Sequence, residues 1–337
     1  MSLDSVIQEM LPEIEAGLKQ AVMEGCNPEY PELRGMLAYH LGWEGEGAGR
    51  EAQGKRIRPV LTLLSAQAAD GDWRNALPAA AAVELLHNFS LIHDDIQDRS
   101  EIRRGRPTVW VKWGVAQAIN AGDVMFTLAF RALHGLVQTT SPEIALEAHR
   151  ILQDVCLRLT EGQYLDLAYE TRNDLSLKDY WPMIAGKTSA LLGGCAELGA
   201  LIAGADEHRR RAFSTFGVKL GLAFQVLDDW LGIWGDAALT GKSTESDLVS
   251  GKKSLPVLYT LEKDSAFARR WQQGAIQPSE VREIVTMLDS AGAQEFTLST
   301  AEQLTFEARQ ALKEAVGEDQ KAASLEELAE RLLARRH

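Results

Sequence analysis

Apolar residues recur at steps of three and four along most of the chain, and this spacing restricts the fold more than any other feature of the sequence. Near the start, the pattern is formed by Val6, Ile7, Met10, Leu11, Ile14, Leu18 and Val22. Similar blocks cover residues 77–98, 116–138, 143–169, 179–203, 207–233 and 253–263. Apolar residues at this spacing fall on one face of a helix, which has 3.6 residues per turn. Strand-like alternation is nearly absent, so the sequence predicts an all-α protein.

The helical blocks outnumber those of a four-helix bundle, and no sustained heptad or fixed-period repeat appears. A chain of 337 residues is long enough to form one large domain. We therefore expect a single multi-helix domain over residues 1–337. Glycine-rich breaks at 42–54 and 235–255 are the candidates for a mobile loop or lid.

The charge balance excludes some classes of function. The formal net charge is −13, which argues against a nucleic-acid partner because that function needs a basic surface. A phosphate ligand stays compatible with this charge, since a bound divalent cation inverts the local charge. The three cysteines are widely separated and fit no zinc pattern, which indicates reduced thiols. No apolar run reaches the roughly 18 residues of a membrane span and no signal peptide is evident, so we expect a cytoplasmic protein.

The segment SLIHDDIQDRSEIRRGRPT, at residues 90–108, gathers acids and then bases. On a helix, Asp94 and Asp98 share a face, with about 5–6 Å between their Cβ atoms. Two carboxylates this close repel each other unless a cation lies between them. Mg²⁺ suits this position because it is a hard ion that binds carboxylate oxygens, keeps waters and bridges to substrate phosphates. The alternative for such a pattern is a solvated acidic helix end.

The residues around these acids favour a functional site. Residues 77–93 are strongly apolar, so the acids lie at the C-terminal end of a buried helix, where the macrodipole disfavours them. A local conflict of this kind is typical of functional sites. His87 lies seven residues before the first acid, and Arg103 and Arg104 follow in a turn. Arginine recognises phosphate through paired donors, so the segment predicts a metal-assisted phosphate site.

A second acidic pair, Asp228 and Asp229, also ends an apolar helical run. Lysines follow it among glycines, as arginines follow the first pair: Lys242, Lys252 and Lys253. The GKS at 241–243 is not part of a P-loop, because Asp236 stands where that pattern needs a glycine and no strand precedes it. The repetition of one design in a single chain argues against chance.

With both acidic clusters in view, the chain resembles the trans-isoprenyl diphosphate synthases, the polyprenyl synthetase family. The motifs that carry the resemblance occur in the family's order: GKRIRP at 54–59, LLHNFSLIHDDIQDRSEIRRGRPT at 85–108, EGQYLDL at 161–167, GKTS at 186–189, FQVLDD at 224–229 and GKKSLP at 251–256. One such motif would be a weak signal, but six in order are specific. The resemblance implies an isoprenoid synthase fold with a central active-site cavity.

The resemblance also implies roles for individual residues. Three Mg²⁺ ions would be held by Asp94, Asp98 and Asp228. The allylic diphosphate would be bound by Arg103, Lys187, Lys242 and Lys252. Isopentenyl diphosphate would be bound by Lys55, Arg58, His87 and Arg104. The site near the reacting carbon would be lined by Thr188 and Gln225.

The implied reaction is a head-to-tail condensation of isopentenyl diphosphate with an allylic diphosphate. The allylic C–O bond ionises, the π-bond of isopentenyl diphosphate attacks the cation, and a proton is lost. The family resemblance also suggests a homodimer. The second motif departs from the family pattern, because Gly232 stands where the third acid is usual. This departure leaves Asp229 and Asp236 without an assigned role as metal ligands.

Two other functions are compatible with parts of the pattern. A class I terpene cyclase uses a similar acidic pair, but it would leave Lys55, Arg58 and His87 unexplained, and its second metal motif is absent at 224–236. A non-catalytic subunit of a prenyltransferase would be expected to lose an aspartate motif, whereas the first motif here is whole. We therefore expect an active prenyltransferase.

Product length is predicted from the helix that carries the first acids. A tail that runs from Asp94 towards the N-terminus of this helix meets new side chains at each turn, or about every 5.4 Å. Ser90, four residues before Asp94, is small and leaves the first turn open, while Phe89 can close the pocket from the side. Among family members this arrangement resembles the geranylgeranyl type. We expect a C20 product, geranylgeranyl diphosphate, with farnesyl and geranylfarnesyl diphosphate as alternatives.

Overall fold

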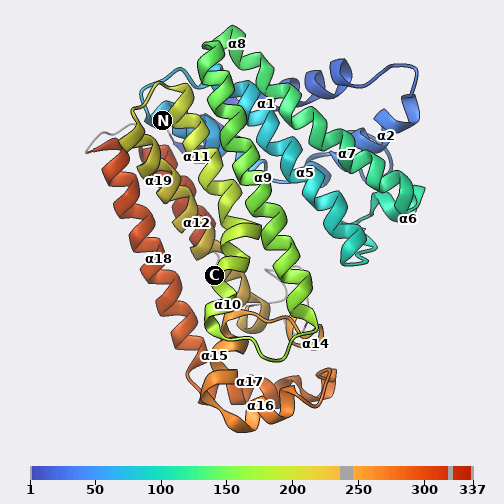
Figure 1. Ribbon diagram of the computed structural model, residues 1–337, viewed down its shortest axis with the longest axis vertical. Coiled ribbons are helices and arrows are strands. Elements are labelled where there is room, and N and C mark those ends of the chain that lie inside the picture. The colour runs from blue at the N-terminus through green and yellow to red at the C-terminus, as the bar shows by residue number, and fades with distance from the viewer. Residues whose placement is uncertain (1, 236–245, 318–321, 335–337) are drawn as a thin grey trace. The chain divides into compact units, whose positions relative to one another are not determined.

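The computed structural model describes residues 2–235, 246–317 and 322–334. These residues are almost entirely helical (Figure 1). Their strands are two short segments, β1 (Ile102–Arg103) and β2 (Arg106–Pro107), which pair as an antiparallel hairpin. The predicted all-α class is therefore confirmed. None of the described helices is long and apolar enough to cross a membrane.

The chain divides into two compact units. Unit 1 comprises Met1–Asp154, Gly194–Arg211 and Glu318–Leu325, as far as these residues are described. Unit 2 comprises Val155–Gly193, Ala212–Gly317 and Glu326–His337, with the same restriction. The single domain over residues 1–337, and the central cavity that the family resemblance implies, stay predictions.

Unit 1 contains the N-terminal helices and the hairpin. The helices are α1 (Leu3–Gly25), α2 (Pro31–His40), α3 (Arg50–Gln53), α4 (Ile57–Ala68), α5 (Leu77–Gln97), α6 (Val109–Trp113), α7 (Val115–Ala132) and α8 (Leu136–Thr139), with 3-10 turns at Trp73–Ala76 and Leu133–Gly135. Helix α5 packs against α1, α4 and α7 (Figure 1). It can do so because its first turns consist of buried alanines, Ala79 to Ala82, whose small side chains admit neighbours on several sides. This burial fixes the helix that ends in the first acidic motif.

Four helices have residues in both units: α9 (Pro142–Glu170), α11 (Ala190–Ile202), α12 (Glu207–Trp234) and α19 (Ala323–Leu333). The other helices of unit 2 are α10 (Leu177–Ile184), α14 (Ser246–Val249), α15 (Leu255–Lys263), α16 (Ser265–Trp271), α17 (Val281–Ser290) and α18 (Ala293–Val316), with a 3-10 turn at Pro278–Glu280. The helical block expected at 179–203 is interrupted by a π-helical turn, Ala185–Ser189, and such turns are frequent at functional sites.

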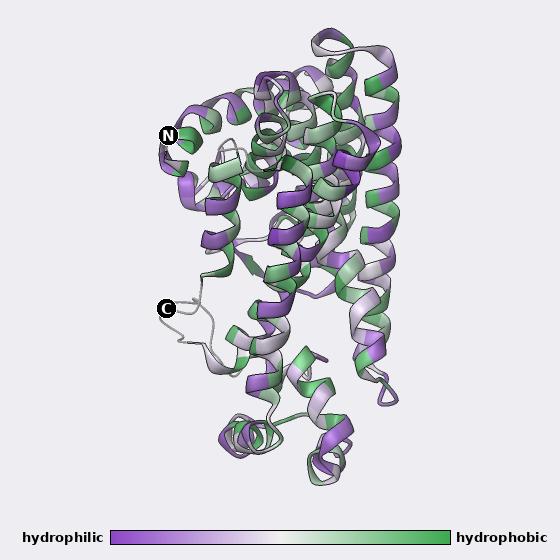
Figure 2. Cartoon of the chain, turned by 90° about the vertical axis from the view of Figure 1, so that its left-hand side faces the viewer, coloured by the Kyte–Doolittle hydropathy of each residue, from purple (hydrophilic) through white to green (hydrophobic). Residues whose placement is uncertain are grey.

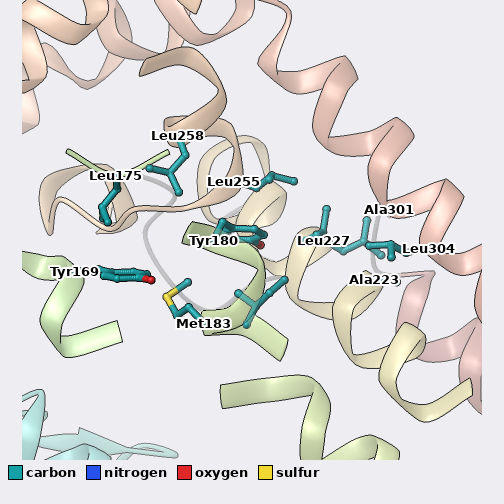
Figure 3. Close-up of a cluster of buried hydrophobic side chains, with 12 residues drawn as sticks. Tyr169, Leu175, Tyr180, Met183, Ala223, Leu227, Leu255, Leu258, Ala301 and Leu304 are labelled. Atoms are coloured by element: carbon teal, nitrogen blue, oxygen red, sulfur yellow. The ribbon is translucent and has the colours of Figure 1, made fainter. Parts of the chain in front are cut away.

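The core of unit 2 is built around Tyr180 of α10, whose side chain is fully buried. Leu227 of α12 and Leu255 and Leu258 of α15 belong to the same cluster (Figure 3). Burying each large apolar side chain stabilises the fold by about 1.5–3 kcal/mol. Individual helices carry both hydrophobic and hydrophilic residues (Figure 2), as amphipathic helices do. The cluster holds α10, α12 and α15 together, and each of these carries or adjoins predicted site residues.

Candidate active site

The first acidic motif lies at the C-terminal end of α5. Asp94 is half-buried and Asp98 is exposed, and Asp98 is the residue that caps the helix. The N–H of Asp98 donates to the carbonyl oxygen of Asp94 at 2.8 Å, so the two residues are one helical turn apart. Their side chains therefore project from the same side of the helix end, as the spacing predicts.

Asp95, between these two acids, has different surroundings. Its side chain is only 2% exposed and accepts hydrogen bonds from Arg103, with Nε at 2.9 Å from each oxygen and Nη2 at 2.8 Å from Oδ1. Burial raises the pKa of Asp95, and the hydrogen bonds from Arg103 oppose that rise. Asp95 is thus used inside the protein to hold Arg103. A guanidinium has five N–H donors, so Arg103 keeps donors for the predicted phosphate.

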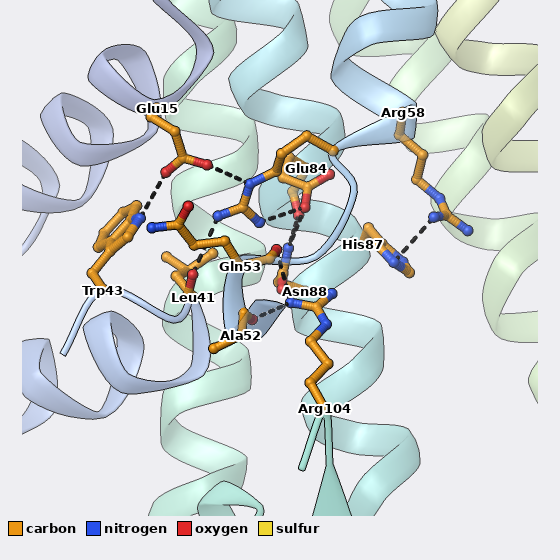
Figure 4. Close-up of polar contacts among 11 residues, drawn as sticks. Glu15, Leu41, Trp43, Ala52, Gln53, Arg58, Glu84, His87, Asn88 and Arg104 are labelled. Atoms are coloured by element: carbon orange, nitrogen blue, oxygen red, sulfur yellow. Dashed lines mark hydrogen bonds and ion pairs between the residues drawn. The ribbon is translucent and has the colours of Figure 1, made fainter. Parts of the chain in front are cut away.

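The hairpin brings Arg104 against the C-terminal end of α3. Its Nη1 donates to the carbonyl oxygens of Ala52 and Gln53, both at 2.9 Å (Figure 4). Burial lowers the pKa of Arg104, and the neighbouring arginines add to this effect. A small cavity beside it is lined by His40, Asp95 and Arg103, among other residues. The structure therefore concentrates positive charge at this point, as expected of a phosphate site.

Arg58 and His87 form the second half of the predicted isopentenyl site. Nη1 of Arg58 donates to Nε2 of His87 at 3.1 Å (Figure 4). Burial and the arginines nearby, Arg58 first, hold the pKa of His87 well below its usual value, so the ring is neutral and Nε2 can accept. Nε of Arg58 is buried and has no hydrogen-bond partner within the described residues. A buried donor of this kind is suited to a ligand oxygen. Lys55 is exposed on the loop between α3 and α4.

A buried ionic network fixes this loop, and sequence reasoning did not find it. Arg56 caps the N-terminus of α4 and has a left-handed backbone, φ +48°. Its guanidinium donates to Glu15 at 2.6 Å and to Glu84 at 2.8 Å. Glu84 also accepts from the side chain of Asn88 at 3.0 Å, one turn along α5 (Figure 4). The signal was present in the sequence, because Glu84 and Asn88 are polar residues four apart on an otherwise apolar helix.

In unit 2, the π-helical turn carries Lys187 and Thr188. The ammonium of Lys187 forms an ion pair with Asp166 of α9, a residue inside the EGQYLDL motif. The backbone of the turn lies directly against the backbone of α9, since a Cβ added at Gly162 would be only 2.0 Å from the backbone nitrogen of Lys187. This close approach explains why glycine stands at that position of the motif. Thr188 Oγ1 donates to Oε1 of Gln225 at 2.9 Å, so the structure brings these two predicted residues together.

Asp229 is the centre of a hydrogen-bond network inside unit 2. It is 1% exposed, and its Oδ1 accepts from Nε2 of Gln225 at 3.1 Å. Its Oδ2 accepts from the Tyr180 hydroxyl at 2.8 Å and from the N–H of Leu255 at 3.0 Å. The last bond satisfies the first amide of α15 and places a negative charge at the N-terminus of that helix, where it is favourable. Asp229 is therefore a structural residue, and its half-buried neighbour Asp228 is the predicted metal ligand of this motif.

Lys252 lies between two carboxylates. Its Nζ is 3.3 Å from Oδ1 of Asp229 and 3.3 Å from Oδ2 of Asp247. Burial opposes its charge, but Asp229, Asp247 and Asp228 outweigh burial and raise the pKa of Lys252. The ammonium is therefore charged at neutral pH. Lys242, the other predicted phosphate ligand of this region, lies outside the described residues, as does Asp236.

The predicted chain-length residues lie on α5. The Phe89 ring packs against Phe126 of α7 and against His93, with centroids 5.1 and 4.8 Å apart. Ser90 is buried, and its hydroxyl donates to the carbonyl oxygen of His87 at 2.8 Å. Phe126, which sequence reasoning did not single out, thus supports Phe89 from the side.

The residues present fit Mg²⁺. Across the described ranges, 2–235, 246–317 and 322–334, no group of three or more His, Cys, Asp or Glu side chains could hold a metal ion by itself. Mg²⁺ needs only one or two protein carboxylates when waters and substrate phosphates complete its octahedron. Asp94 and Asp98 present such carboxylates at the end of α5, while the Asp95 carboxylate holds Arg103. Two carboxylates are therefore enough for a Mg²⁺ ion whose other ligands are waters and diphosphate oxygens.

The chain is an all-α protein in which carboxylates at helix ends are accompanied by arginines or lysines, the types of side chain that bind a diphosphate with the help of a divalent cation. Comparison with known proteins identifies the family. The family model described as polyprenyl synthetase matches residues 49–288. The chain belongs to the polyprenyl synthetase family, and the predicted family and fold class are thereby confirmed.

Individual relatives agree with this assignment. The chain is 46% identical to a (2E,6E)-farnesyl diphosphate synthase of Mycobacterium tuberculosis H37Rv over 243 residues, which are 71% of this chain. The match spans 66% of the farnesyl diphosphate synthase, just under two thirds of its length. It is 42% identical to a geranylgeranyl diphosphate synthase of the same strain over 291 residues, 84% of this chain and 82% of that protein. The solved structure of a geranylgeranyl pyrophosphate synthetase from Pyrococcus horikoshii matches with a TM-score of 0.88 and 32% identity, covering 98% of both chains.

Proposed function

We propose that the protein is a Mg²⁺-dependent prenyltransferase that condenses isopentenyl diphosphate with allylic diphosphates, head to tail, to give geranylgeranyl diphosphate. The observation that carries the proposal is the basic cluster that Arg58 and Arg104 form around the neutral ring of His87, in which the buried Nε of Arg58 has no hydrogen-bond partner among the described residues. A second diphosphate needs such a cluster, and a cyclase does not. The geranylgeranyl and farnesyl diphosphate synthases among the relatives support the same reaction.

The protein residues divide the work of binding and ionisation. Bound to Asp94, Asp98 and Asp228, magnesium would supply Lewis-acid stabilisation of the departing pyrophosphate, and three ions per site remain our prediction. Arg103 and the lysines Lys187, Lys242 and Lys252 bind the allylic diphosphate. The positive charges of these side chains favour ionisation of the allylic C–O bond, because they offset the negative charge that develops on the departing pyrophosphate.

The second substrate is held by the basic cluster of unit 1. Lys55, Arg58, His87 and Arg104 bind the diphosphate of isopentenyl diphosphate, whose π-bond attacks the allylic carbon. Thr188 and Gln225, fixed by their mutual hydrogen bond at 2.9 Å, line the site near the reacting carbon. The released pyrophosphate takes up the proton that the new chain loses. Water has to be excluded, since it would hydrolyse the cation.

The product is assigned from Phe89 and Ser90 of α5. Ser90 leaves room for the tail, and Phe89, supported by Phe126, closes the pocket from the side. The farnesyl diphosphate synthase among the relatives makes a C15 product the second candidate. The proposal also includes a homodimer in the cytoplasm, which analytical ultracentrifugation and cell fractionation would check.

The test of the metal assignment is Asp94→Ala. Turnover of isopentenyl diphosphate with an allylic diphosphate should be lost while the circular dichroism spectrum and the Tm stay close to wild type, because the half-buried side chain contributes little to the core. Asp123→Ala, which changes an exposed aspartate of α7, is the control and should keep full turnover. Near-native kcat and unchanged Mg²⁺ dependence in Asp94→Ala would sink the assignment.

A further inference from the structure

The backbone of the loop between α3 and α4 has positive φ angles on both sides of the exposed Lys55. Gly54, with φ +78°, adopts such a backbone without strain because it has no Cβ. Arg56, with φ +48°, is strained, and a non-glycine residue keeps this backbone only where its surroundings hold it there. Strain of this kind gathers at functional sites, so the contacts that hold Arg56 indicate what the loop has to present.

Three acceptors hold the guanidinium of Arg56. Its Nε donates to Oε1 of Glu15 at 2.6 Å, its Nη1 to Oε1 of Glu84 at 2.8 Å, and its Nη2 to the carbonyl oxygen of Leu41 at 3.2 Å (Figure 4). Arg56 is 3% exposed and Glu84 is 2% exposed. Burial opposes the charge of Arg56, but Glu84 and Glu15 outweigh burial and raise its pKa. The side chain is therefore a buried cation that is fixed on three sides.

Arg56 and Arg58 contact the same face of α5, one turn apart. Glu84 and His87 are three residues apart on that helix, so their side chains are neighbours on its surface. Arg56 bonds to Glu84 at 2.8 Å, and Arg58 bonds to Nε2 of His87 at 3.1 Å. The first contact joins opposite charges and is the stronger, because the second joins a guanidinium to a neutral ring. The ion pair therefore sets the position of the first turn of α4 on α5, and the contact between Arg58 and His87 depends on it.

We infer that Arg56 is a positioning residue of the isopentenyl diphosphate site. Its ion pair with Glu84 holds the left-handed turn, and this turn orients the residues on either side of it, Lys55 and Arg58. The inference rests on the proposed function, because it assigns these two residues to the second substrate of that reaction. Arg56 itself is buried and acts through them.

The turn and the ion pair can be tested separately. Removing Arg56 alone would leave Glu84 as a buried charge without its partner, so Arg56→Ala and Arg56→Gly are each combined with Glu84→Gln. Glycine keeps a positive φ without strain, whereas alanine does not. In EDTA, which removes metal-dependent binding, the Kd of inorganic pyrophosphate from calorimetry should rise on the order of 10- to 100-fold in the alanine double variant. It should rise less in the glycine double variant.

Control variants separate positioning from simple damage. Arg74→Ala breaks an exposed ion pair with Glu9 in the same unit, at 2.7 Å, and should leave the Kd of pyrophosphate unchanged. Arg56→Lys keeps a positive charge opposite Glu84 and guards against a variant that fails to fold. Its single ammonium cannot reproduce the planar fork of the guanidinium, so the Kd should still rise. Arg58→Ala should abolish the same binding, because it removes the buried donor.

Steady-state kinetics give a second readout. The alanine double variant should raise KM for isopentenyl diphosphate while KM for the allylic substrate and kcat change little, a split that general damage to the fold would not produce. Equal Kd values in the alanine and glycine double variants, or an equal rise of both KM values, would overturn the inference. If the wild type condenses the substrates but the variants bind pyrophosphate as it does, the inference fails and the proposed function stands. If pyrophosphate binding follows the predicted order but the wild type condenses nothing, the proposed function fails and the positioning role stands.

Discussion

Asp228 and Asp229 are neighbours in one motif, but their surroundings predict opposite effects for the same substitution. Asp229→Asn should lower the free energy of unfolding, because its carboxylate accepts from four donors and is 1% exposed. Asp228→Asn should cost less stability than Asp229→Asn, because the Asp228 side chain is only half-buried and asparagine keeps its size. It should nevertheless lose most turnover, because Asp228 is the predicted metal ligand.

The magnitude for Asp229→Asn follows from its partners. Whichever oxygen becomes an amide nitrogen, two of the four donors then face another donor. The Tyr180 hydroxyl can rotate to accept, but the N–H of Leu255 cannot. Each buried donor left without an acceptor costs about 1–3 kcal/mol, and the charge lost at the N-terminus of α15 costs about 0.3–1 kcal/mol more. We expect a total of about 2–4 kcal/mol.

Urea denaturation followed by circular dichroism would measure this difference, with Tyr180→Phe as the matched control. That variant removes one donor and keeps the carboxylate, so it should cost about 1 kcal/mol. An Asp229→Asn variant as stable as the wild type would refute the structural role of Asp229. A larger loss of stability in Asp228→Asn than in Asp229→Asn would show that the two roles are reversed.

Three further predictions address the substrates, the product and pH. Arg58→Ala should raise KM for isopentenyl diphosphate far more than for the allylic substrate in steady-state kinetics; equal effects would mean that the two diphosphate sites are exchanged. By product chromatography, Phe89→Ala should lengthen the product beyond C20 and Ser90→Phe should shorten it towards C15, and the depth argument is wrong if neither does. Burial, and then the neighbouring arginines, hold the pKa values of His40 and His87 well below their usual value of 6.5, so the unfolded chain binds more protons below that pH. As the pH falls below 6.5, the free energy of unfolding should therefore decrease by up to about 1.4 kcal/mol per pH unit for each histidine. His40→Gln should make this decrease less steep, and an equally steep decrease in the variant would contradict the reasoning.

The sequence predicted the helical class because apolar spacing is local information. The spacing of Asp94 and Asp98 likewise needed only the geometry of one helix. The same reasoning could not find the break at Ala185–Ser189, where the close approach of Gly162 matters, because contact between distant segments leaves no periodic signal.

The supporting residues of the site were harder to predict for the same reason. Asp95 is indistinguishable from Asp94 in sequence, and only burial shows that it binds Arg103. Gly232 looks only like a missing acid in the sequence, and the structure alone shows that it lies beside the side chain of Asp247, fifteen residues later. Pairings of this kind depend on tertiary structure, so sequence gives the candidate ligands and not the residues that position them.

Product analysis with the purified chain tests the central claim most directly. The protein would be incubated with Mg²⁺, labelled isopentenyl diphosphate and, in turn, dimethylallyl, geranyl or farnesyl diphosphate, and the dephosphorylated products would be separated by chain length. Our account predicts that a C20 alcohol accumulates from each primer and that none forms when Mg²⁺ is chelated. A C15 end product would contradict the assigned length, and a cyclic hydrocarbon, or no elongation at all, would contradict the proposed reaction.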